Sequence, residues 1–265
     1  MDARDHFKNG NLTAAVAAMI QEVKQHPTDS GARTFLAELL CFTGDFERAA
    51  KHLELVADQD AARSIPIAQF RQLLRAEIAR HQTFDEGRVP HFLAPPPPHI
   101  EKALRALASL RAGNEPEAAE LLAEAEALCP ALAGQCDGKP FDDFRDADDI
   151  TAGLIEVLTI TGHYHWVPLT EILEITFQPP QRPRDLLWRR ARLSIRSGPD
   201  GEVFIPVLYP TLPPESPDQV RLGHATRWTD QPGSPVRGIG QRLFLAGDQD
   251  LAITEISALV FREGV

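Results

Sequence analysis

The sequence has little cysteine and no long apolar run. Its 265 residues include three cysteines, Cys41, Cys129 and Cys136, an odd number without a recognised metal-binding spacing. Such sparse thiols are typical of a reducing compartment. No apolar run reaches the roughly 18 residues that cross a bilayer, and the polar start Met1–His6 lacks a signal-peptide stretch. We therefore expect a cytoplasmic protein that has no membrane partner.

Basic charge is also scarce. The formal net charge is −11, whereas a free-standing nucleic-acid binder normally shows a basic balance or a basic stripe. Arginines gather only between Arg182 and Arg196, and such a run is usually a solvated strand face. We expect no nucleic-acid partner, and RNA binding by this run is the weaker alternative.

The common catalytic signatures are missing. The sequence contains no Walker-type Gly-Lys-Ser/Thr, no Gly-x-Ser-x-Gly and no His-Glu-x-x-His. The stretch Gly238–Gln241 lacks the third glycine and the helix of a dinucleotide fingerprint. The sequence therefore predicts no catalytic residues and no cofactor.

Two clusters keep a metal-dependent enzyme open as the alternative. Five aspartates lie between Asp142 and Asp149, and hard cations bind several carboxylate oxygens. The EF-hand spacing is absent, so we favour a solvated linker face or a helix N-terminus. His163 and His165 share one side of an expected strand, but a metal would need further ligands. Structural placement beside Trp166 is therefore the favoured interpretation.

A short phrase is repeated three times in the first half. The stretches Gly10–Ala15, Gly44–Ala49 and Gly113–Ala118 each begin with Gly, continue through a short polar step and end with Ala. The first two glycines are 34 residues apart, which is the period of a tetratricopeptide (TPR) repeat. In a helical hairpin, Gly reverses the chain, Ala allows close packing, and a later Pro such as Pro27 or Pro130 ends the helix. TPR-like arrays usually bind other proteins.

Residues 1–133 are therefore predicted to form a TPR-like helical repeat domain. Pro66 can start a further helix where a third repeat should begin, but the Gly…Ala phrase is absent there. One degenerate or replaced repeat is expected at this place. The run Ala94–Pro98 excludes a helix and favours polyproline II. We interpret it as a stiff connector rather than an SH3 or WW ligand.

Residues 134–265 are richer in Pro, Arg and β-branched residues, and they predict a small, mostly antiparallel β domain with short helices. The turn-forming stretch Ser197–Gly201 predicts a hairpin, whereas Glu171–Ile175 fits a short helix or a strand. The overall expectation is a multidomain protein, α in its first part and α+β in its second. The strand candidates are Leu154–Thr161, Leu187–Ile195, Val203–Tyr209, Gln241–Leu245 and Leu251–Phe261.

All three Trp and both Tyr residues lie in the second half, where large aromatics anchor either a core or an interface. Six second-half segments carry a resemblance: Glu156–Leu158, Gly162–Pro168, Arg184–Trp188, Pro206–Pro210, Gly223–Trp228 and Gly238–Arg242. In combination, they resemble the ImpE family, also called TagJ or SciE-type, of type VI secretion accessory proteins. The helical repeats ahead of them match the TPR-like first half of that family.

The resemblance implies a cytoplasmic, non-enzymatic adaptor. Members of the family are understood to bind the small subunit of the tail sheath through its N-terminal helix, and to be linked to the ClpV unfoldase that recycles contracted sheath. The family offers no catalytic residues to carry over. Its motif residues fit either partner binding or a purely structural role in the second domain. The partner-binding candidates are Trp166, Asp185, Trp188, Arg189 and Tyr209.

Overall fold

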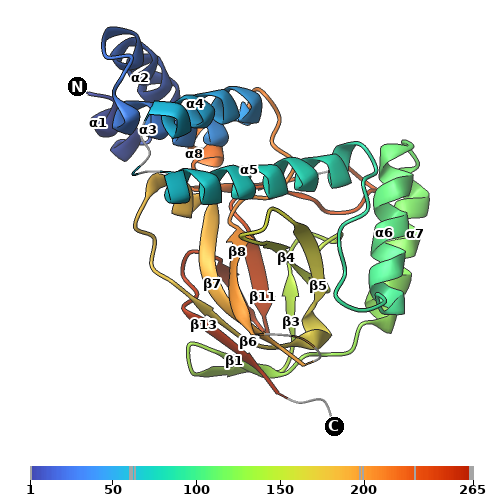
Figure 1. Ribbon diagram of the computed structural model, residues 1–265. Coiled ribbons are helices and arrows are strands. Elements are labelled where there is room, and N and C mark those ends of the chain that lie inside the picture. The colour runs from blue at the N-terminus through green and yellow to red at the C-terminus, as the bar shows by residue number, and fades with distance from the viewer. Residues whose placement is uncertain are drawn as a thin grey trace.

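A computed structural model describes residues 2–59, 62, 64–196, 198, 200–229 and 231–262. Figure 1 shows the first helices packed together above one end of the long helix α5, which lies across the top of the β-sheets. The hairpin of α6 (Pro98–Arg111) and α7 (Glu115–Leu128) stands beside the sheets (Figure 1). The predicted fold class, TPR-like hairpins followed by antiparallel sheets with short helices, is confirmed.

Three helical hairpins correspond to the three repeated phrases. Gly10, Gly44 and Gly113 lie at the three turns, and their φ angles are 76°, 77° and 76°. This left-handed conformation is one that glycine adopts without steric cost. Each phrase ends with an alanine that has no exposed surface, so the second helix of each pair packs closely. The hairpin helices are α1 (Ala3–Lys8), α2 (Leu12–Gln25), α3 (Ser30–Phe42), α4 (Phe46–Gln59), α6 (Pro98–Arg111) and α7 (Glu115–Leu128).

The expected degenerate repeat is replaced by one long helix and a connector. Helix α5 spans Ser64–Asp85, and residues 86–97 form the extended connector to α6. One residue of the connector, His91, pairs with the edge of the large sheet. Its N–H donates to the carbonyl of Tyr164, and its carbonyl accepts from the N–H of Trp166. The expectation that all the prolines of Ala94–Pro98 lie outside a helix is wrong for Pro98. It occupies the first position of α6, where the missing N–H has no helical partner to lose.

The second half forms three antiparallel sheets. The largest has eight strands in the order β2-β1-β13-β6-β7-β8-β4-β5, and the smaller ones are β12-β11-β3 and β10-β9. The short helices are α8 (Asp218–Arg221), η2 (Leu169–Glu171) and η3 (Pro183–Leu186). The strands are β1 (Gly134–Cys136), β2 (Lys139–Phe141), β3 (Phe144–Asp146), β4 (Leu154–Leu158), β5 (Tyr164–Pro168), β6 (Ile172–Phe177), β7 (Trp188–Ile195), β8 (Gly201–Pro206), β9 (Thr226–Trp228), β10 (Gly238–Gly240), β11 (Leu243–Ala246), β12 (Gln249–Ala252) and β13 (Ala258–Phe261).

Most strand predictions are confirmed, with two refinements. The single strand expected at Leu251–Phe261 is wrong, because the stretch divides between β12 and β13, which belong to different sheets. The ambiguous stretch Glu171–Ile175 becomes strand after the short η2 turn. Strands β7 and β8 pair as the predicted hairpin; Ser197 and Pro199 of its turn lie outside the described residues.

One continuous cluster of buried apolar residues extends from the hairpins through α5 into the sheets. Helix α7 ends at Leu128 and β1 begins at Gly134, and the division into independent domains at residues 133 and 134 stays a prediction. Within the described ranges, none of the helices combines the length and apolar character needed to cross a membrane.

Candidate functional site

A cavity of about 770 Å³ lies where the first hairpins meet α5 and the loop that follows β8. We call it the hairpin cavity. Its apolar wall includes Phe42 and Phe46 from the turn between α3 and α4, together with Leu212 from the loop. Charged and polar groups of α5 and α8 complete the lining. An apolar wall with a few convergent polar groups is the usual composition of a binding site.

The loop that forms one wall of this cavity, residues 207–217, is fixed by Arg221 at its far end. The guanidinium group donates hydrogen bonds to the carbonyl oxygens of Ser216, at 3.0 Å, and of Pro214. Arg221 also reaches the carbonyl of Thr43, at 3.5 Å, beside the turn between α3 and α4. One arginine therefore holds the proline-rich wall against the second hairpin.

A second contact joins α8 to the first hairpin. Asp218 accepts hydrogen bonds from the backbone N–H and the hydroxyl of Thr13, both at 3.0 Å. The N-cap residue of α2, Asn11, makes no side-chain capping bond. The start of α2 is capped instead by a carboxylate 205 residues away.

Beneath the cavity, α5 presents ionisable groups toward the sheet. Glu77 accepts hydrogen bonds from the indole N–H of Trp188, at 2.9 Å, and from Nη1 of Arg80, at 3.0 Å. His81 lies 3.3 Å from the same carboxylate. Arg80 is 2% exposed and also donates to the carbonyl of Leu208 at 2.8 Å. The cavity floor is thus tied to both the helix and the loop.

Glu156 of β4 is the centre of this buried network. Its two carboxylate oxygens accept hydrogen bonds from Nε and Nη2 of Arg80, at 2.7 and 3.0 Å, and the two side chains form a bidentate pair. It also accepts hydrogen bonds from Arg242 and from the hydroxyl of Tyr164, which in turn accepts from the indole N–H of Trp166. Glu156 itself has no exposed surface, so its charge is stabilised by the protein alone.

The network continues into the second sheet through Arg242, which also pairs with Asp146 of β3. Asp146 also accepts a hydrogen bond from the hydroxyl of Tyr209 at 2.8 Å. A Cβ at Gly238 would lie 2.1 Å from Cε2 of Tyr209, so only glycine permits this approach. The glycine at the start of the Gly238–Gln241 stretch therefore serves close packing.

These surroundings shift the pKa values strongly. Burial alone would raise the pKa of Glu156, but the guanidinium groups of Arg80 and Arg242 outweigh it and hold the value at about 2. Burial of Glu77 is likewise outweighed by Arg80 and His81, and its pKa is also about 2. Burial would lower the pKa of His81, but hydrogen bonds to Asp85 and Glu77 raise it to about 9. The network is therefore an ionic one at neutral pH.

Four of the five predicted partner-binding residues are buried. Trp166 is fully buried, Tyr209 is 1% exposed, Trp188 2% and Arg189 7%. Trp188 and Tyr209 also line the hairpin cavity, whereas Trp166 does not and belongs to the buried network through its hydrogen bond to Tyr164. Partner binding by these residues stays a prediction, and direct contact with Trp166 would require the covering elements to move.

Arg189 and the fifth candidate, Asp185, have identifiable local roles. Nη1 of Arg189 donates to the carbonyls of Ile253 and Ile256, which fixes the loop between β12 and β13. The carboxylate of half-buried Asp185 accepts hydrogen bonds from the backbone N–H groups of Gln181 and Arg182, at 2.8 and 2.9 Å. These bonds lie at the start of η3.

The expected solvated face is wrong for two residues of the aspartate cluster. Asp146 and Asp148 have no exposed surface. Asp146 pairs with Arg242, and Asp148 accepts Nε of Arg237 at 2.9 Å and the N–H of Gly238 at 2.9 Å. The acidic residues are buried because distant arginines in the chain neutralise them, which their spacing could not reveal.

The histidine pair gains a third member from the connector. The ring of His91 lies 5.1 Å from that of His163 and 5.3 Å from that of His165. Burial, together with the two neighbouring imidazoles, lowers the pKa of His165 to about 4. Across the described ranges, no three His, Cys, Asp or Glu residues are arranged to hold a metal ion. Neither cluster therefore provides an observation in favour of the metal-dependent enzyme.

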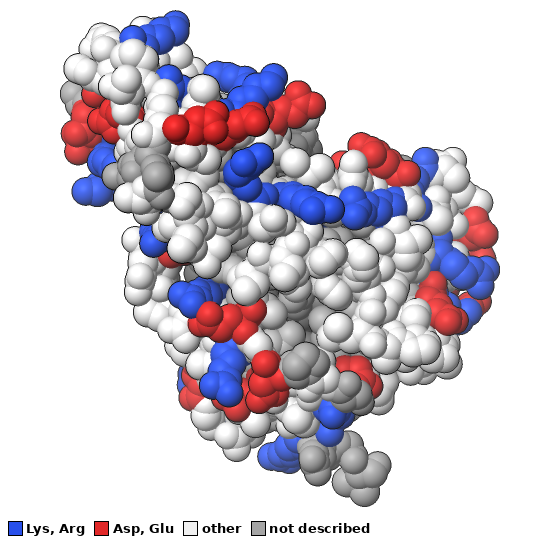
Figure 2. All heavy atoms as spheres, viewed as in Figure 1, with Lys and Arg blue, Asp and Glu red and all other residues white. Residues whose placement is uncertain are grey.

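The arginine-rich run is largely engaged within the fold. Arg184 lies over the ring of Phe70 at 4.5 Å, and Arg190 forms an exposed pair with Glu202. Arg196 donates to the carbonyl of Thr170 at 2.9 Å. Lys and Arg side chains instead gather along α5 on the face shown in Figure 2, with a wide uncharged area below them.

Sequence reasoning missed the buried charges of α5, although a signal was present. The apolar positions Phe70, Leu73 and Phe84 follow helical spacing, and Glu77 and Arg80 fall on the same stripe. Charged residues on an apolar stripe are buried only when they are paired. The two residues therefore pointed to partners elsewhere in the chain.

Comparisons with known proteins agree with this architecture. The family model described as ImpE protein matches residues 138–260, and a tetratricopeptide repeat model matches residues 6–74. The type VI secretion system accessory component TagJ of Pseudomonas aeruginosa is 32% identical over 263 residues, covering 98% of this chain and 91% of that protein. The crystal structure of VPA1032 from Vibrio parahaemolyticus superposes with a TM-score of 0.93 at 25% identity, covering 99% of this chain and 98% of the other.

Proposed function

The chain belongs to the ImpE family of type VI secretion accessory proteins, and from this premise we propose that it is a cytoplasmic, non-enzymatic adaptor. Its partner is the small subunit of the tail sheath, and the N-terminal helix of that subunit binds in the hairpin cavity. The observation that carries the proposal is the position of this cavity between TPR-like hairpins and the ImpE-type sheets.

The composition of the cavity supports a helical occupant. An amphipathic helix binds through a few apolar anchors spaced by one turn, with charged residues at the rim. The cavity offers half-buried Phe46 and Leu212 as apolar contacts. Glu215, Asp218 and Arg221 line it as well and provide charges of both signs.

The buried network supports a preformed site. Arg80 joins the cavity floor to β4 and to the loop carbonyl of Leu208, so the walls keep their spacing without a partner. A rigid site loses less conformational freedom on binding than a mobile one. A link to the ClpV unfoldase follows from the same proposal, because an adaptor that holds the sheath subunit can present it for disassembly.

The test is a calorimetric titration of the purified protein with a peptide of the N-terminal helix of the cognate small sheath subunit, with a scrambled peptide as control. We expect a saturable complex of micromolar or tighter affinity. Leu212→Arg in the cavity wall should weaken it by at least tenfold, because the variant buries an unpaired charge.

A matched control is Leu93→Arg, the same substitution on the connector outside the cavity, where the side chain is 56% exposed. Its affinity should equal that of the wild type. Equal binding by both variants would refute the hairpin cavity as the site. Absence of binding to both the peptide and the intact sheath subunit would refute the adaptor proposal itself.

A further inference from the structure

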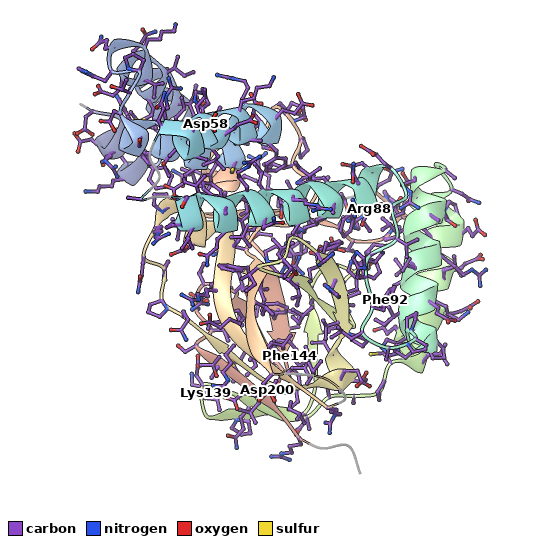
Figure 3. The ribbon with its side chains drawn as sticks, viewed as in Figure 1. Asp58, Arg88, Phe92, Lys139, Phe144 and Asp200 are labelled. Atoms are coloured by element: carbon purple, nitrogen blue, oxygen red, sulfur yellow. The ribbon has the colours of Figure 1, made fainter. Side chains whose placement is uncertain are left out.

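A second cavity, separate from the hairpin cavity, lies between the hairpin α6–α7 and the sheets. We call it the α7 cavity. Its volume is about 380 Å³. Apolar side chains of the two helices, among them Ile100, Ala103 and Leu122, form one side. Phe144 and Ile150 line the opposite side, and Figure 3 shows Phe144 among the sheets, away from the connector residue Phe92.

One imidazole in the wall of this cavity lacks a partner. His99, in the first turn of α6, is 5% exposed, and its Nε2 is buried without a hydrogen bond. The ring packs against Gly153, where a Cβ would lie 3.1 Å from Cδ2 and 3.6 Å from Nε2. Buried ring nitrogens normally find a partner, so this Nε2 is available to form a hydrogen bond with a ligand in the cavity.

The charged residues of the lining are mostly acidic. They are Glu126 and Asp143, which are exposed, and half-buried Asp149, beside a single arginine, Arg145. None of the three carboxylates forms a salt bridge with a Lys, Arg or His of the described chain. Asp149 accepts the N–H of Val236 at 2.7 Å through Oδ2. The cavity therefore combines negative charge with an excess of hydrogen-bond acceptors.

An ammonium group fits this chemistry. It carries three donors and no acceptor, and its positive charge complements the carboxylates. The tautomer of His99 with its proton on Nδ1 can accept one of those donors at Nε2. An aliphatic chain attached to the ammonium would pack against Ile100, Leu122 and the alanines of α6 and α7. Anionic and acceptor-only ligands are disfavoured by the same residues.

We propose that the α7 cavity binds a primary ammonium group on a short aliphatic chain, through His99 together with Asp143 and Asp149. The group is supplied by a free amine or by a lysine side chain of a partner protein. This proposal does not rest on the sheath-binding function, because the two cavities share no lining residue.

The experiment is a titration of the full chain, followed by calorimetry, with three probes. Nα-acetyl-lysine methylamide and 1,5-diaminopentane carry the ammonium, and Nα-acetyl-norleucine methylamide keeps the alkyl chain without it. We expect saturable binding of at least one amine and at least tenfold weaker binding of the norleucine probe. Tighter binding of the diamine identifies a free amine as the ligand, and tighter binding of the lysine derivative identifies a protein side chain.

Variants locate the site. Asp149→Asn keeps an acceptor for the N–H of Val236 but removes the negative charge. It should lower the affinity for the amine probes on the order of fivefold, and Asp143→Asn should do the same. His99→Phe keeps the ring and removes Nε2, and it should also weaken binding. Asp142→Asn is the matched control, because Asp142 is exposed and does not line the cavity.

Thermal unfolding of each variant verifies that the fold is intact. The proposal would be overturned if neither amine bound more tightly than the norleucine probe. The same conclusion follows if neither amine saturates, or if Asp142→Asn weakens binding as much as Asp143→Asn.

Discussion

Neutralising Glu156 should destabilise the protein more than any comparable surface change. The variant Glu156→Gln leaves Arg80 and Arg242 facing an uncharged group in the interior, and breaking a buried pair from one side costs about 3–5 kcal/mol. The pKa of Glu156 gives a second estimate of this loss in folding free energy. A fall from the ordinary 4.5 to about 2, at about 1.4 kcal/mol for each pH unit, corresponds to about 3 kcal/mol.

The measurement is thermal unfolding at pH 7. For a chain of this size, about 3 kcal/mol corresponds to a fall in Tm of roughly 6–12 °C. The matched control is Glu202→Gln, which breaks an ion pair with Arg190 whose side chains are 58% and 52% exposed. An exposed pair contributes about 0–1 kcal/mol, so this variant should lose no more than about 4 °C.

The pH dependence tests the same reasoning with a defined sign. Because the folded pKa of Glu156 lies below its unfolded value, its stabilisation is fully present above about pH 4.5 and disappears as the pH falls toward 2. Wild type should therefore lose stability in acid more steeply than Glu156→Gln. Equal Tm losses in the two variants at pH 7, or parallel acid curves for wild type and Glu156→Gln, would refute the argument.

Three further predictions concern the helices. Gly44→Ala should cost about 1–2 kcal/mol in chemical unfolding because of the positive φ, whereas Gly201→Ala, with open space and no positive φ, should stay near the wild type. Asp218→Ala removes the long-range cap and should lose about 0.5–2 kcal/mol. A double-mutant cycle with Thr13→Val should show coupling, and additive effects would exclude the hydrogen bond between the Thr13 hydroxyl and Asp218. His81→Gln should flatten the stability change between pH 6.5 and 9, because a raised pKa stabilises the fold below 6.5 and this contribution is lost as the pH rises through 9.

The helical half could be predicted well because its signals are local. A Gly at a turn and an Ala five residues later constrain one hairpin each, and both act within a few residues of sequence. The replacement of a repeat by α5 was visible as a missing phrase. The capping of α2 by Asp218 was not predictable, since the two partners are separated by 205 residues and neither carries a distinctive pattern.

The site was predicted only in part, and for a physical reason. The resemblance identified Trp166, Trp188 and Tyr209, but it did not show whether these aromatics face a partner or the interior. Their hydrogen bonds end on carboxylates or on another buried hydroxyl, which depends on strands from distant parts of the sequence lying side by side. Because these hydrogen bonds depend on the topology of the fold, the composition and periodicity of the sequence could not predict them.

The cap on α2 also imposes an order on synthesis. The first hairpin leaves the ribosome long before the carboxylate of Asp218, which stabilises the start of its second helix. At about 5–20 residues per second, the delay across 205 residues is roughly 10–40 s. Until nearly the whole polypeptide has been translated, α2 therefore lacks its cap and the hairpin cavity lacks one wall. A nascent chain stalled before residue 218 would not contain a complete hairpin cavity, so this protein acquires its proposed binding surface only at the end of its own production.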